Sequence, residues 1–78
     1  MELMQLKENL IVTYQRQGNN KNGNPIYIVN FFQKIGDNWV NINYSIPNRP
    51  RLDKYCNFRL TSYNIEETVK YIGLNLNL

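Results

Sequence analysis

The stretch IYIVNFF, residues 26–32, is the longest apolar run in this chain of 78 residues. It is apolar on both of its alternating sides, as is typical of a strand that is covered at least in part on both faces. Pro25, directly before it, suits the first position of a strand, where no ladder donor is needed. We therefore predict the central strand of a sheet over residues 26–32.

A second strand is predicted just upstream of this run. Residues 10–14, LIVTY, are β-branched or aromatic apart from the first, as strands prefer. Residues 17–24 carry almost no apolar side chain, and Asn22-Gly23 is a pair that favours positive φ. These features predict an antiparallel pair joined by a long hairpin loop over residues 17–24.

Downstream, residues 36–38 form a predicted turn and residues 39–46 then alternate for eight positions. Alternation predicts a third strand with two distinct faces. The inward set is Val40, Ile42, Tyr44 and Ile46, and the outward set is Trp39, Asn41, Asn43 and Ser45.

A fourth strand is predicted after a loop over residues 47–53, whose two prolines are incompatible with a central strand. This loop carries Arg49 and Arg51. The following residues alternate again, with Cys56, Phe58 and Leu60 predicted inward and Tyr55, Asn57, Arg59 and Thr61 predicted outward.

The C-terminal part predicts one helix. Asn64 is a favourable N-cap, and the two glutamates after Ile65 lie in the first turn, where the helix dipole favours them. The helix is predicted to reach about Ile72, with Gly73 as its stop and Ile65, Val69 and Ile72 as its apolar stripe. Residues 74–78 alternate again, which predicts either a short edge strand or a tail that orders against a partner.

Strands followed by a helix favour the α+β class: one domain over residues 1–78, with an antiparallel three- to four-stranded sheet and one C-terminal helix packed on one face. An all-β barrel of the oligonucleotide-binding kind is the alternative, and it needs a further strand from residues 74–78.

The chain lacks the side chains that most catalytic and metal-site chemistry needs. The chain has no His, one Cys and no cluster of carboxylates in any short window, so we expect no enzyme, no metal and no cofactor. Cys56 has no partner for a disulfide, which favours a reducing compartment. The N-terminal residues do not form a signal peptide, and no run of about 18 apolar residues occurs, so a cytoplasmic protein is expected.

The distribution of charge points to a polyanion. The net charge is +3, and residues 16–59 hold seven basic side chains against two acidic ones. Basic side chains grip phosphates, and aromatic side chains on a sheet stack on bases. A solvated surface with ordinary packing at the sheet rim is the alternative interpretation. The predicted nucleic-acid-binding residues are Arg16, Lys21, Lys34, Trp39, Asn41, Asn43, Arg49, Arg51, Tyr55 and Arg59.

The order of elements over residues 26–72 resembles the small DNA-binding domains at the N-termini of tyrosine recombinases, through a hairpin, a last strand at 58–61 and a helix opening at 65. No specific motif is shared, and the loop at 47–53 and the leading strand depart from that pattern. The resemblance implies a sheet that enters the major groove, with base and phosphate contacts from Trp39, Asn41, Asn43 and Arg59.

Two functions follow as hypotheses. The first is a small intracellular nucleic-acid-binding protein, an accessory factor of a phage or mobile element, since 14 Asn and no Ala are typical of low-GC coding. The second is a protein–protein interaction module or inhibitor that uses an exposed strand edge, including pairing with a second copy of itself.

Overall fold

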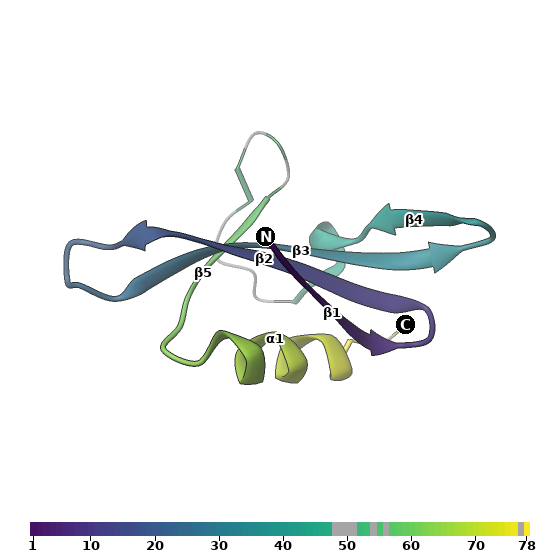
Figure 1. Ribbon diagram of the computed structural model, residues 1–78. Coiled ribbons are helices and arrows are strands. Elements are labelled where there is room, and N and C mark those ends of the chain that lie inside the picture. Colours follow the sequence, from purple (N-terminus) through teal and green to yellow (C-terminus); the bar gives the residue numbers. More distant parts are fainter. Residues whose placement is uncertain (48–51, 54, 56, 77) are drawn as a thin grey trace.

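The computed structural model describes residues 1–47, 52, 53, 55, 57–76 and 78. Within these residues, five strands form one antiparallel sheet and a single α-helix follows them. The helix, α1, lies along one side of the sheet (Figure 1). The predicted α+β class is therefore confirmed, with more strands than the sequence indicated.

The two longest strands form the middle of the sheet. β2 spans Leu10–Asn19 and β3 spans Pro25–Ile35, and they pair antiparallel along most of their length. The predicted central strand is confirmed, including its start at Pro25. The predicted long loop is wrong at its beginning, because β2 continues to Asn19 past a register shift at Gly18, whose φ is +111°.

An edge strand that the sequence analysis missed, β1, spans Glu2–Lys7 and pairs antiparallel with β2. Met4 and Leu6 on this strand are half-buried and pack against the core. Their spacing of two was the available signal. It was weak because two apolar residues among charged neighbours do not form a run.

The predicted strand over residues 39–46 is only half right. β4 spans Asn38–Asn41, and the chain then enters a short 3₁₀ helix, η1, at Asn43–Ser45. Ile42 and Ile46 are buried as predicted, whereas Val40 and Tyr44 are exposed. The alternation therefore does not continue beyond β4.

The alternation ends after β4 because two strands, β4 and β5, share the second edge of β3. β4 pairs with residues 32–35 of β3, and β5, which spans Phe58–Thr61, pairs with residues 26–29. The two strands diverge at Asn30 and Phe31, so the chain must leave the sheet after β4. We call this point the fork.

Asn43 fills the fork. It was predicted to face outward, and it is instead completely buried. Its Oδ1 accepts from the Phe31 backbone N–H at 2.8 Å, and its Nδ2 donates to Asn30 Oδ1 at 2.8 Å and to the Val29 carbonyl at 3.4 Å. The side-chain amide thus takes the place of a neighbouring strand, because buried backbone groups need partners.

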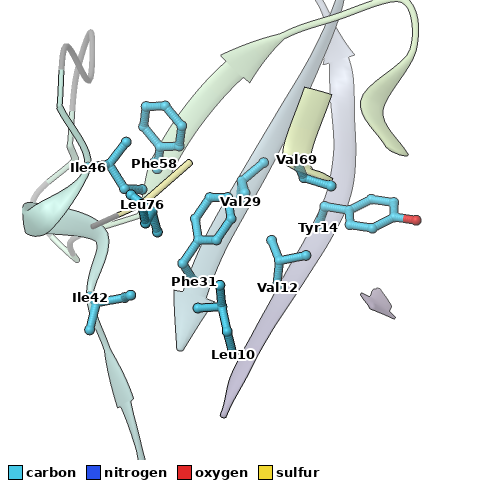
Figure 2. Close-up of a cluster of buried hydrophobic side chains, with 10 residues drawn as sticks. All are labelled: Leu10, Val12, Tyr14, Val29, Phe31, Ile42, Ile46, Phe58, Val69 and Leu76. Carbon is cyan, nitrogen blue, oxygen red and sulfur yellow. The ribbon is translucent and has the colours of Figure 1, made fainter. Parts of the chain in front are cut away.

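The core lies between the sheet and α1 (Figure 2). Alternate residues of β2 and β3 supply its centre, and Phe31, Val29, Val12 and Leu10 have no exposed surface. The complete buried set is Leu10, Val12, Tyr14, Val29, Phe31, Ile42, Ile46, Phe58, Val69 and Leu76.

The helix α1 spans Ile65–Leu74 and begins as predicted, with Asn64 Oδ1 accepting from the Glu67 N–H at 3.3 Å. The predicted stripe of Ile65, Val69 and Ile72 is confirmed, since Val69 is buried and the other two pack against the core.

The predicted stop at Gly73 is wrong. Gly73 is buried inside the helix, and a Cβ at this position would overlap Leu6 Cδ1 and lie 3.2 Å from Phe31 Cε1. Glycine at this position therefore allows α1 to approach the sheet closely, and it does not end the helix.

The C-terminal segment also differs from its prediction. Leu74 ends the helix, Asn75 Nδ2 donates to the Tyr71 carbonyl at 2.7 Å, and Leu76 is buried in the core. Leu76 is therefore part of this chain's own core, whereas Leu74 and Asn75 are exposed. The predicted inward position of Cys56 lies outside the described residues. Of the helices in the described ranges, none is long and apolar enough to cross a membrane.

Candidate functional site

The sheet has one face against α1 and one face that points away from it, which we call the open face (Figure 1). Strand alternation assigns its residues, because every second side chain of a strand points to the same side. None of them belongs to the buried core or packs against it. The registers place on the open face Leu3, Gln5, Ile11, Thr13, Gln15, Ile26, Ile28, Asn30, Phe32, Lys34, Trp39, Asn41, Arg59 and Thr61.

Aromatic and basic side chains lie close together at one end of the open face. Lys34 on β3 is directly opposite Trp39 on β4, and Phe32 is diagonal to Trp39. Diagonal neighbours across two strands are roughly 7 Å apart, within reach of aromatic side chains. Trp39 is 41% exposed and Phe32 is half-buried. Two rings and one cation therefore share a small area of sheet.

Arg59 supplies a second cation on the same face. It is exposed on β5 and lies opposite Ile28. Lys34 is six positions after Ile28 on β3, so the two cations are roughly 20 Å apart along the sheet. Among the strand residues of the open face there is no carboxylate.

Carboxylates gather instead on the helix side. Glu66 and Glu67 are in the first turn of α1, and Glu2 shares the face of β1 that points to the helix. Burial raises the pKa of the Tyr14 hydroxyl, and Glu66 and Glu2 raise it further. Lys7, Arg16 and Lys70 also lie on the helix side, so charges of both signs are mixed there, whereas the charged strand residues of the open face are both basic.

Four of the predicted site residues lie on the open face: Lys34, Trp39, Asn41 and Arg59. Arg16 does not, because it pairs with Tyr27 on the face toward the helix, and its Nη2 donates to Asn19 Oδ1 at 2.7 Å. Lys21 is exposed at the tip of the β2–β3 hairpin, away from the aromatic residues.

Of the other predicted site residues, Tyr55 is exposed in the loop before β5, and Asn43 is buried in the fork. The predicted outward position of Asn43 is therefore wrong, and its side chain is not accessible to a ligand in this fold. Arg49 and Arg51 lie outside the described residues. Phe32 was missed because both faces of its strand are apolar, so the sequence did not show which one it occupies.

Asparagines join the fork to the open face. Asn30 Oδ1 accepts from Asn41 Nδ2 at 3.2 Å as well as from Asn43, and Asn30 Nδ2 donates to Asn57 Oδ1 at 3.1 Å. The Asn41 side chain also makes a second hydrogen bond, in which its Oδ1 accepts from the Asn43 N–H at 2.9 Å. These amides hold the strands together, so Asn41 has little capacity left for a ligand.

Asp53, in the segment before β5, joins this network because its Oδ2 accepts from Asn57 Nδ2 at 3.1 Å. The Asn57 backbone N–H lowers the pKa of its carboxyl, burial opposes the change, and the Asn57 side chain, the Tyr55 N–H and Arg59 lower the pKa further. The carboxylate is thus held ionised by local hydrogen bonds. Its charge lies near Arg59 and offsets part of that cation's field.

No group of three or more potential metal-ligating side chains occurs in the part of the chain that is described. The chain matches no family model, and neither a curated protein nor a solved structure matches it.

Proposed function

We propose that this protein binds single-stranded nucleic acid over the open face of its sheet. The observation that supports the proposal most strongly is the grouping of Trp39, Phe32 and Lys34 at one end of a face that also carries Arg59 and, in its described strands, no carboxylate. Aromatic rings stack on unpaired bases, and cations beside them attract the phosphates.

A single strand suits this face better than a duplex does. Bases in a duplex are stacked on one another and present only their edges, whereas unpaired bases can lie flat on a ring. Trp39 and Phe32 offer rings on a sheet surface, and no described helix or long loop is placed to enter a groove. Stacking on one such ring contributes about 1–3 kcal/mol per base with little dependence on sequence.

The salt dependence of binding tests the electrostatic part of the proposal. We expect a labelled oligothymidylate to bind at low ionic strength, as measured by fluorescence anisotropy. Two phosphate contacts, at Lys34 and Arg59, predict a slope of about −1.4 in a plot of log K against log salt concentration, and any further contact steepens it. Failure to bind at low ionic strength would remove the proposal.

A matched pair of arginine variants tests the location. Arg59→Gln and Arg16→Gln remove the same charge from exposed strand positions on opposite faces of the sheet. We expect Arg59→Gln to weaken binding several-fold and to make the slope less steep by about 0.7, and Arg16→Gln to leave the slope nearly unchanged. Equal losses from both variants would mean that attraction is not localised to the open face.

A further inference from the structure

The strand β1 forms one edge of the sheet. The order of strands is β1-β2-β3-β4, with β5 beside β3, so β1 has a neighbour on one side only. On its other side, no described strand pairs with the backbone N–H and C=O groups of β1. Such an edge is a template for another strand.

Apart from an irregularity between Gln5 and Lys7, little in β1 protects this edge. The strand contains no proline, and its charges are confined to its two ends, Glu2 and Lys7. Leu3 is 64% exposed and Met1 85% exposed beside it. β4 and β5 have four residues each, against six in β1. β1 is therefore the longest free edge in the described sheet.

An irregularity in β1 places its two charges on the same side. The register shifts between Gln5 and Lys7, so that Lys7 as well as Leu6 faces Leu10. Leu10 points into the core, and Glu2 faces the core residue Tyr14 at the other end of the strand. Glu2 and Lys7 therefore both lie on the helix side of β1, and both are exposed.

We propose that β1 pairs antiparallel with β1 of a second copy, about a twofold axis at Met4. In this register Glu2 of each copy lies against the bulge that carries Lys7 of the other copy, on the same face, so two opposite-charge contacts form by symmetry. A twofold axis perpendicular to the sheet keeps the faces aligned, so the two open faces become continuous. The proposal does not depend on nucleic-acid binding.

Charge reversal with rescue tests this pairing. We expect sedimentation equilibrium of the wild-type chain to show a concentration-dependent dimer. Glu2→Lys and Lys7→Glu each create two like-charge contacts and are expected to raise the dimer Kd by about tenfold or more. The double variant exchanges the charges and is expected to return the Kd to within about threefold of the wild-type value.

Asp37→Lys is the control for net charge. Asp37 is exposed in the β3–β4 turn, away from β1, and its replacement changes the net charge as Glu2→Lys does. We expect it to leave the Kd unchanged, and circular dichroism spectra and melting curves establish that each variant is folded. A wild-type chain that stays monomeric at millimolar concentration would overturn the proposal. A dimer whose Kd is unchanged in the two single variants would also overturn it. So would a double variant whose dimer Kd is no lower than that of either single variant.

Discussion

Replacing Asn43 with leucine is expected to lower the free energy of unfolding by about 3 kcal/mol. Leucine keeps the branched shape of the side chain and removes both polar atoms. The Phe31 N–H then has no acceptor in the fork, and the Val29 carbonyl and Asn30 Oδ1 each lose a donor. An unsatisfied buried polar group costs about 1–3 kcal/mol, and the site is completely buried. For a domain of this size the melting temperature should fall by about 15 °C.

Asn38→Ala is the matched control, because Asn38 is exposed at the start of β4. Its melting temperature should stay within a few degrees of the wild-type value, as measured by circular dichroism. Asn43→Asp should be at least as damaging as leucine at neutral pH and should recover in part on acidification, because only the protonated carboxyl can donate to Asn30. If the Asn43→Leu variant has the same melting temperature as the wild-type protein, the Asn43 amide does not stabilise the fork.

Gly73→Leu is expected to destabilise the fold by about 1–2 kcal/mol. The new side chain would need the space that Leu6 and the buried Phe31 occupy between α1 and the sheet. Overpacking a close contact costs about 1–3 kcal/mol. Replacing glycine with leucine inside a helix gains roughly 1 kcal/mol, which offsets part of that cost. Urea unfolding measures the difference.

Tyr71→Leu introduces the same residue at an exposed position of the same helix and should change stability by less than about 1 kcal/mol. A double-mutant cycle locates the contact. Gly73→Ala should be less harmful when Leu6 is also replaced by alanine, because the overlapping Cδ1 is then absent. Strictly additive effects would contradict the close approach described above.

Local patterns in the sequence were sufficient for the central strand and the helix. The apolar run at 26–32 predicted β3 because a strand buried on one face and half-buried on the other needs few polar residues. Asn64 and the two glutamates after Ile65 predicted the start of α1, because capping depends only on adjacent residues.

Features that depend on distant pairing could not be predicted in this way. Asn43 occupies an outward position in an alternating run, yet it is buried because β4 and β5 both pair with β3 and diverge beside it. Nothing near Asn43 in the sequence shows that two strands share that edge. Gly73 was assigned to termination for the same reason, since the contact with Leu6 joins opposite ends of the chain.

The candidate site was predictable in part. The contrast between Trp39, which faces outward, and Ile42, which is buried, agreed with the predicted alternation. The sequence grouped Arg16 with Arg59 because both lie in the basic middle of the chain. The sheet separates them, because the register of each strand decides which face a side chain occupies.

Fluorescence emission from Trp39 reports whether unpaired bases contact the open face. Trp39 is the only tryptophan in the chain and is partly exposed on that face. Titration with unlabelled oligothymidylate at low salt should quench its fluorescence to a plateau, and added salt should reverse the quenching. Binding seen by anisotropy without any change in Trp39 emission would contradict contact between the bases and the open face. An absence of binding would contradict it as well.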